Sequence, residues 1–468
     1  MASSVARALD RIKEDLEPHL PAAMIESACR DVGHVWRRRK LGPVETIHLF
    51  VLQILHLNTA IRHLRHLAGV PVNAAAYCEA RMRLPLAALQ ELLRKSSASL
   101  RDALGGECGG GGGGGDLTRW RGHRAFLVDG TGTAVPDTPQ LRKVFKRPTG
   151  RLKGPGLPVP KVLGLFDAMT GLIVEAMAFC LFVHEASKVW LLHPLLAAGD
   201  LLVGDRGFCS YAHLALLSGR GVLGLFRINQ QSQIVSFRYR RKHYDHRGGG
   251  KRLKAQRGRP RSRWVRRLGK HDQVVRWVKP RAKEGPKWMT REQFAALPDE
   301  LEVREIRYRV NEKGRRTREV TIVTTLLDPA LYPKASIAEL YGIRWRAETH
   351  LRELKTTLGM ERLKCQTEAG VRKELAAYCL AYNLVRAVMV RAAARQGVTP
   401  DRISFTDALR WLLSAAAPGE EMPVLVINPK RPGRWHPRVL KHTSRTFPKM
   451  TRERHKYRLP TKVKKPAA

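Results

Sequence analysis

The apolar positions in the first 104 residues recur at the spacing of amphipathic helices. The clearest run has intervals of 3, 1, 3 and 1 residues and consists of Ile47, Phe50, Val51, Ile54 and Leu55. This period matches one face of an α-helix. A second helix is expected over Asn73–Arg83, after the turn-like sequence Gly-Val-Pro-Val. The pair fits either a helix-turn-helix whose second helix enters a DNA groove or two core helices. We predict an all-α N-terminal DNA-binding domain over residues 1–104.

Seven consecutive glycines at 109–115 interrupt this pattern. No regular structure favours such a run, so residues 105–118 are predicted to form a Gly-rich linker. Short apolar runs and helical segments then alternate through residues 119–228. The expected strands are 125–128, 161–166, 172–179, 201–203 and 222–228, and the expected helices are 187–198 and 211–217. Their order is typical of an α/β sheet with an antiparallel edge.

The pattern changes again after residue 228. Alternating runs at 302–310 and 317–327 are typical of β-hairpins, and helical spacing resumes over 337–358 and 371–394. We therefore predict that a β-rich piece is inserted into an α/β domain. The predicted parts are a first core part at 119–228, a basic β-rich insertion at 229–336, a second core part at 337–400, and a C-terminal region with a basic tail at 401–468.

Charge narrows the class of partner. The 468 residues carry 85 Lys or Arg and 41 Asp or Glu, a formal net charge of +44. Much of the excess lies in two segments, 238–270 and 430–468. Such density attracts phosphate backbones. Glycine and proline in both segments disfavour the amphipathic helix that membrane binding needs. No uncharged stretch is long enough to cross a membrane, and the first residues include acids where a signal peptide is apolar. We predict a cytoplasmic nucleic-acid-binding protein with no membrane partner.

One basic motif suggests a particular groove contact. Arg257, Arg259 and Arg261 form an Arg-Gly-Arg-Pro-Arg sequence that resembles the core of an AT-hook, whose arginines enter a narrow minor groove. A solvated basic loop is the alternative. These three arginines are predicted DNA-binding residues.

Two aspartates stand where apolar strands are expected to end. Asp129 follows the run 125–128, and Asp205 follows Gly204 after the run 201–203. Open α/β sheets place ligands at such strand ends. Two neighbouring carboxylates can hold Mg²⁺, and a pair of such ions can stabilise both oxygens of a phosphoryl displacement. The alternative is that each aspartate only caps a turn.

A later helix carries a third candidate carboxylate. Tyr341, Arg344, Glu348 and Lys355 share one face of the helix expected over 337–358. A carboxylate flanked by a phenol, a guanidinium and an ammonium suits a metal-bound phosphate. The alternative is a solvated face with ordinary ion pairs. On the residues alone the two interpretations are equally good.

These residues resemble a known family. Tyr341, Arg344, Glu348 and Lys355 match the Y-(2)-R-(3)-E-(6)-K signature of bacterial transposases of the insertion-sequence-four type, within the DDE group. The segments Val-Asp129-Gly-Thr and Gly-Asp205-Arg-Gly-Phe are similar to its two aspartate motifs. The likeness covers roughly residues 120–395.

The resemblance implies a ribonuclease-H-like catalytic core with a β-rich insertion. By this resemblance Asp129, Asp205 and Glu348 would be catalytic and would hold two Mg²⁺ ions, with Mn²⁺ able to substitute. Tyr341, Arg344 and Lys355 would contact DNA phosphates.

The implied activity is excision of an insertion sequence from its inverted-repeat ends through a DNA hairpin, followed by joining to target DNA. A homodimer acting on double-stranded DNA in the bacterial cytoplasm, on nucleoid DNA, is expected. The alternatives are an endonuclease without strand transfer and a DNA-binding protein with a vestigial site.

Overall fold

The structure is a computed structural model, and the part it describes covers most of the predicted core. The described residues are 20–37, 39–68, 73–109, 118–148, 156–228, 261–281, 285–310, 319–414 and 422–429. Arg257, Arg259, most of the glycine run and the basic tail lie outside them. Arg261 begins a strand, but its side chain is not among those described.

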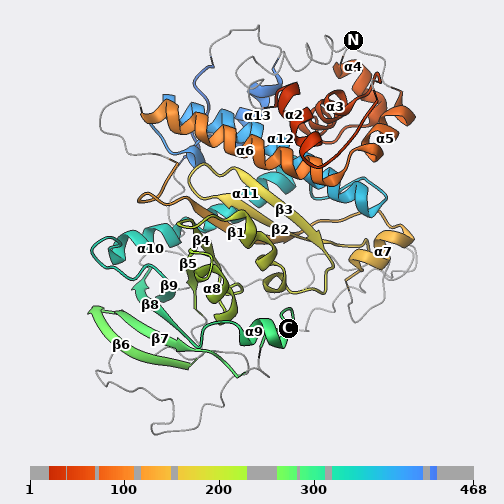
Figure 1. Ribbon diagram of the computed structural model, residues 1–468. Coiled ribbons are helices and arrows are strands. Elements are labelled where there is room, and N and C mark those ends of the chain that lie inside the picture. The colour runs from red at the N-terminus through yellow and green to blue at the C-terminus, as the bar shows by residue number, and fades with distance from the viewer. Residues whose placement is uncertain are drawn as a thin grey trace, which may run out of the picture.

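Within the described residues the strands form one nine-stranded sheet, in the order β3-β2-β1-β4-β5-β9-β8-β7-β6 (Figure 1). The strands are β1 (Ala125–Gly132), β2 (Lys161–Asp167), β3 (Ile173–Phe179), β4 (Leu201–Gly204), β5 (Leu223–Arg227), β6 (Arg261–Gly269), β7 (Asp272–Val278), β8 (Glu300–Arg309) and β9 (Glu319–Thr324). β1, β4 and β5 are parallel, and the other pairings are antiparallel. The predicted mixed α/β class, with its antiparallel edge, is confirmed.

The β-rich segment continues the core sheet. β9 pairs with β5 of the core, and β8, β7 and β6 follow outward as antiparallel neighbours. A buried ion pair fixes β7 against β8: Arg304 donates from Nε and Nη2 to the two carboxylate oxygens of Asp272, at 2.8 and 2.6 Å. The short helix α9 (Arg291–Ala295) lies between β7 and β8.

Helices cover both faces of the sheet. The helices before β1 are α2 (Ala22–Asp31), α3 (Pro43–Leu55), α4 (Leu64–Ala68), α5 (Ala74–Arg83) and α6 (Leu86–Gly109), with the 3₁₀ turn η2 (Ile61–His63). Those after β9 are α10 (Lys334–Gly342), α11 (Trp345–Arg352), the π-helix η6 (Glu353–Thr357), α12 (Glu368–Arg395), η7 (Pro400–Arg402) and α13 (Phe405–Leu413). The face of the sheet opposite α11 and α12 carries η3 (Glu185–Ser187), η4 (Val189–Leu195) and α8 (Tyr211–Ser218). The helix α7 (Pro139–Phe145) follows β1 along the chain.

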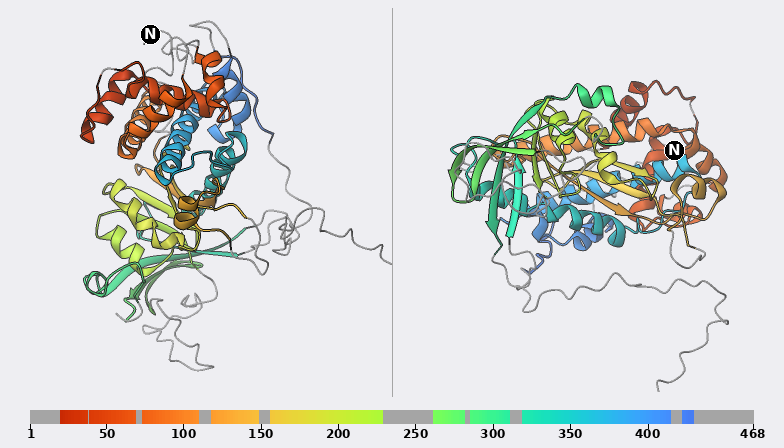
Figure 2. Two further views of the ribbon diagram at one scale, coloured as in Figure 1. Left: turned by 90° about the vertical axis from the view of Figure 1, so that its right-hand side faces the viewer. Right: turned by 90° about the horizontal axis from the view of Figure 1, so that it is seen from below.

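The N-terminal helices share a hydrophobic core with the rest of the chain. α6 and α3 pack on α12, and both α6 and α12 pack on β3, so these helices stand together on one side of the sheet (Figure 2). One cluster of buried apolar side chains runs through all of them. α12 alone among the described helices is long and apolar enough to cross a membrane, but 94% of that stretch is buried, as expected of a core helix.

Three predicted elements differ in the structure. The segment 187–198 forms 3₁₀ turns rather than an α-helix, because Pro194 interrupts it. The helix expected over 337–358 is broken after Gly342 and again at Glu353, where it becomes a π-helix. α6 continues to Gly109, past the predicted start of the linker at 105. The turn of the proposed helix-turn-helix, 69–72, lies outside the described residues.

Candidate active site

Asp129 and Asp205 are neighbours at two adjacent interior strands of the sheet. β1 and β4 are parallel, and Val128 of β1 is paired with Gly204 of β4. Each aspartate is the next residue along the chain. Asp205 follows the end of β4, whereas Asp129 lies within β1, which continues to Gly132 beyond the strand end expected at 128. The two residues lie side by side where the parallel pairing of β1 and β4 stops, and open α/β sheets bind ligands at such positions.

Both aspartates belong to the side of the sheet that α11 covers. Leu127 and Val203, two residues before them, are buried in the same core cluster as Ala347 of α11. Side chains two residues apart on a strand point to the same face. α11 also packs directly on β1. The side chains of Asp129 and Asp205 therefore point toward the helix that carries the third predicted carboxylate.

Arg344 links the predicted carboxylates. It lies between α10 and α11, is 5% exposed, and its Nη2 is 3.3 Å from Oε1 of Glu348. Burial alone would lower the pKa of Arg344, but surrounding negative charge holds this pKa above its usual value. The groups that raise this pKa are Tyr341, Asp205, Glu348 and Asp129. The guanidinium group of Arg344 thus contacts Glu348 and lies within electrostatic range of Asp129 and Asp205.

The carboxyl group of Asp129 is held in an unfavourable environment for its charge. The pKa of Asp129 is raised from 3.8 to about 6, mainly by burial and also by the negative charges of Glu348 and Glu185. The backbone N–H of Gly130, which donates to Oδ1 at 2.9 Å, and the positive charge of Arg344 oppose that rise. The net effect is that ionisation of the buried Asp129 carboxyl group is unfavourable, and a bound cation would offset that cost.

Two hydrogen-bond donors in this site have no partner. Tyr341 is 5% exposed, and its hydroxyl is buried without a hydrogen bond to any described residue. The same holds for Nε of Arg344. Burial raises the pKa of the Tyr341 phenol well above its usual value, so this hydroxyl keeps its proton. Buried donors are costly unless a ligand accepts from them, and a phosphate oxygen is a suitable acceptor.

Sequence reasoning missed a further cation at the same edge. Arg227 ends β5 and follows Phe226, which is paired with Gly204 of β4. It therefore stands one strand away from Asp205, at the same level of the sheet. Its Nε is buried without a described partner, and its charge acts on Tyr341. The signal in the sequence was an arginine directly after the apolar run 222–226. Whether such an arginine reaches the site depends on the order of the strands, which the sequence does not give.

A fourth carboxylate, Glu185, was also missed. A Cβ added to Gly130 would lie 2.7 Å from the carboxyl carbon of Glu185. The absence of a side chain at Gly130 therefore gives the Glu185 carboxyl group its space beside β1. In the part of the chain that the structure describes, no hydrogen bond or ion pair is recorded for this carboxyl group. Only the glycine after Asp129 signals this approach in the sequence.

The donor set fits a hard divalent cation. Among the described residues no group of three His, Cys, Asp or Glu side chains is placed to hold a metal ion. Mg²⁺, however, is usually held by one or two carboxylates together with substrate phosphates. The paired Asp129 and Asp205 supply two carboxylates, and the partly exposed Glu348 supplies a third. The cost of ionising the buried Asp129 is the feature of this structure that favours a cation here.

Lys355 is the predicted site residue that is not seen joining the others. It lies in η6, where the π-helical turn changes the angular spacing of side chains from that of an α-helix. No hydrogen bond or ion pair with Tyr341, Arg344 or Glu348 is recorded for it among the described residues. A spacing of seven from Glu348 therefore does not by itself place Lys355 in the site.

Comparisons relate this chain to proteins that are already known. The family model described as "Transposase DDE domain" matches residues 120–384. The chain is 26% identical, over 398 residues, to the transposase InsG for insertion sequence element IS4 of Escherichia coli (strain K12), covering 81% of this chain and 78% of that protein. A cryo-EM structure of the piggyBac transposase synaptic complex with hairpin DNA aligns with 87% of this chain and 79% of its own, at 10% identity and a TM-score of 0.38.

Proposed function

This chain belongs to the family of transposases with a DDE domain, and we propose that it excises an insertion sequence and joins it to target DNA. It is a DNA transposase of the insertion-sequence-four type. The proposal adds that it binds inverted-repeat ends and cuts them through a hairpin intermediate. It further assigns the cleavage and joining chemistry to Asp129, Asp205 and Glu348. In this proposal a homodimer holds the two DNA ends and acts on nucleoid DNA in the bacterial cytoplasm.

The order of the strands supports a ribonuclease-H-like core. Parallel β1, β4 and β5, flanked by the antiparallel pair β2 and β3, carry the two aspartates at one edge. The third carboxylate comes from a helix far along the chain, after the inserted strands. This arrangement assembles one site from three distant segments, which suits a core interrupted by an insertion.

Each side chain then has a distinct part. We assign Asp129, Asp205 and Glu348 to holding two Mg²⁺ ions, for which Mn²⁺ can substitute. Bound there, such ions activate the attacking oxygen and stabilise the leaving oxygen of a phosphodiester. Arg344 and Tyr341 donate to phosphate oxygens through the buried atoms that lack partners. The same donors serve every step, because hydrolysis, hairpin formation and joining are all phosphoryl transfers.

One observation carries the proposal: the buried guanidinium of Arg344 contacts Glu348 and lies within electrostatic range of Asp129 and Asp205, while its Nε has no partner among the described residues. A structural ion pair would need one carboxylate for one arginine. An excess of carboxylates beside unused donors suits a ligand that contains both cations and phosphate.

A strand-transfer assay tests this function. A supercoiled plasmid that carries the flanking inverted repeats is incubated with the protein and Mg²⁺. We expect nicked and linear products, hairpin ends, and joining of a labelled 3′ hydroxyl end to a second plasmid. The Glu348→Gln variant should lose all products while retaining DNA affinity.

The same assay separates the alternatives. Cleavage without joining would instead identify an endonuclease. DNA binding without any Mg²⁺-dependent product in the wild-type protein would identify a binding protein with a vestigial site.

A further inference from the structure

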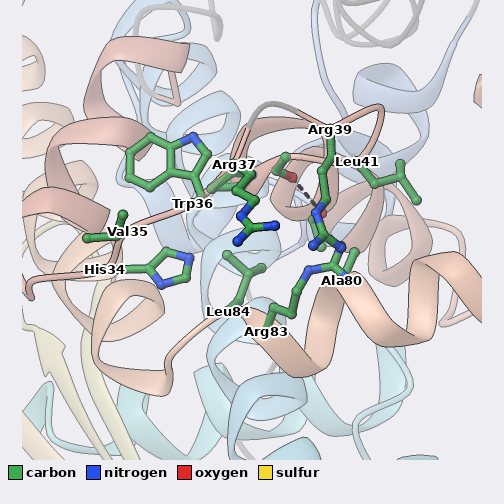
Figure 3. A pocket seen from close by; sticks show the side chains of 12 residues that line it. His34, Val35, Trp36, Arg37, Arg39, Leu41, Ala80, Arg83 and Leu84 are labelled. Atoms are coloured by element: carbon green, nitrogen blue, oxygen red, sulfur yellow. Dashed lines mark hydrogen bonds between the residues drawn. The ribbon is translucent and has the colours of Figure 1, made fainter.

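A basic pocket lies among the N-terminal helices, in a part of the chain that does not contribute to the carboxylate site. It has a volume of about 220 Å³ and opens between the loop that follows α2, the start of α3 and the end of α5 (Figure 3). Its lining includes His34, Val35, Trp36, Arg37, Arg39 and Arg83. The lining contains three arginines and no Asp or Glu.

The three arginines point into the same space. Arg37 and Arg39 come from the loop, and Arg83 comes from the last turn of α5 (Figure 3). No ion pair is recorded for Arg37 or Arg39 among the described residues. Arg83 has only a loose pair with Glu79, at 3.9 Å and with both side chains well exposed, which contributes little. Like charges repel when they converge, so this arrangement favours a bound anion.

The rest of the pocket suits an anion on a larger ligand. Gly42 stands just before α3, but its backbone N–H already donates to Oε2 of Glu45 at 3.0 Å and Pro43 has no N–H, so the arginines supply the positive charge of the pocket. At its rim the rings of His34 and Trp36 are stacked, with centroids 5.8 Å apart, and Val35 is 90% exposed. A free inorganic ion would leave these flat and apolar surfaces unused, whereas a nucleotide beside the bound phosphate would cover them.

We propose that this pocket binds a phosphate of the DNA backbone, as a second contact separate from the carboxylate site. The inference rests on the proposed function for the identity of the polymer. It assigns Arg83 of α5 to a phosphate rather than to a base in a groove. Phosphate contacts position a protein on the duplex without selecting sequence, so this pocket would help to orient the DNA.

The salt dependence of DNA binding tests the pocket. The full-length protein is titrated against a fluorescein-labelled 40-base-pair duplex of arbitrary sequence, in EDTA, at several NaCl concentrations. The test variant is R37Q/R39Q/R83Q. A matched control is R220Q/R395Q/R410Q, which removes three exposed arginines outside the pocket. Equal melting temperatures for the three proteins would show that folding is intact.

A pocket for one phosphate makes a numerical prediction. The slope of log affinity against log salt should fall by about 0.9 in the test variant, which corresponds to one lost phosphate contact. Affinity at low salt should fall about tenfold, whereas the control should match the wild type.

Three outcomes would overturn the proposal. They are an unchanged slope, an equal loss in the control, and a loss about three times larger, which would mean that the arginines contact separate phosphates. Because EDTA suppresses catalysis, the result does not depend on transposition. A wild-type protein that binds DNA with a steep slope but never cuts it would overturn the proposed function alone.

Discussion

Replacing Asp129 by asparagine should stabilise the protein at neutral pH in the absence of metal. The substitution keeps the shape of the side chain and the acceptor for the N–H of Gly130, but removes the buried charge. Burial raises the pKa of Asp129 from 3.8 to about 6 in the folded protein. One pKa unit corresponds to about 1.4 kcal/mol, so the ionised carboxyl group costs about 3 kcal/mol of folding free energy at pH 7.5.

The direction in which stability changes with pH follows from proton binding by Asp129. Between the unfolded and folded pKa values the folded state holds the proton more tightly, so stability falls as the pH rises from about 4 to 6 and stays low above that range. The variant lacks this contribution. Its advantage over the wild type should be about 3 kcal/mol at pH 7.5 and roughly half of that at pH 5.

Urea denaturation of both proteins in EDTA at the two pH values measures this difference. Added Mg²⁺ should stabilise the wild type more than the variant, because the variant lacks one of the assigned ligands. A variant that is no more stable than the wild type at pH 7.5 would refute the argument that Asp129 is held in an environment built for a cation. So would a gap that does not narrow at pH 5.

Three other substitutions test separate parts of the account. Tyr341→Phe should leave the melting temperature unchanged, because the hydroxyl has no described partner, and should slow plasmid cleavage roughly 10²-fold; normal cleavage would exclude its assigned contact with phosphate. Gly130→Ala should destabilise by about 1–3 kcal/mol through its clash with Glu185, and a second change, Glu185→Ala, should recover much of this loss in denaturation experiments. Arg304→Leu should cost about 3–5 kcal/mol, since it leaves the carboxylate of Asp272 buried and unpaired, and a small loss of melting temperature would contradict that view.

Much of the catalytic core could be predicted from local pattern. Asp129 comes directly after the apolar run 125–128, and Asp205 comes shortly after the run 201–203. The structure pairs these two runs in parallel. Glu348 was found through its spacing from Arg344, and the structure keeps these two in contact because four residues span one helical turn. These predictions depended on neighbours within a strand or a turn, which the sequence specifies directly.

The remaining features depended on distant packing. Arg227 enters the site because β5 lies next to β4, and Glu185 comes close to β1 because a 3₁₀ turn brings it against Gly130. The spacing of residues along the chain predicts neither of these contacts. The helix that carries Lys355 was expected to be continuous, yet Gly342 and the π-turn of η6 interrupt it.

The predicted start of the linker at residue 105 was wrong for a similar reason. Glycine disfavours helix, but α6 continues to Gly109 after Leu100 and Leu104 have packed into the shared core. Tertiary contacts can override weak local propensity in this way.

The central claim is that three carboxylates from distant segments surround one metal site. Fe²⁺ that replaces Mg²⁺ can generate hydroxyl radicals with ascorbate and peroxide, and these cut the backbone close to the bound ion. The account predicts cuts near residues 129, 205 and 348 together, all suppressed by excess Mg²⁺ and all lost in Asp129→Asn. Cuts confined to one of the three segments, or cuts that persist unchanged in that variant, would contradict it.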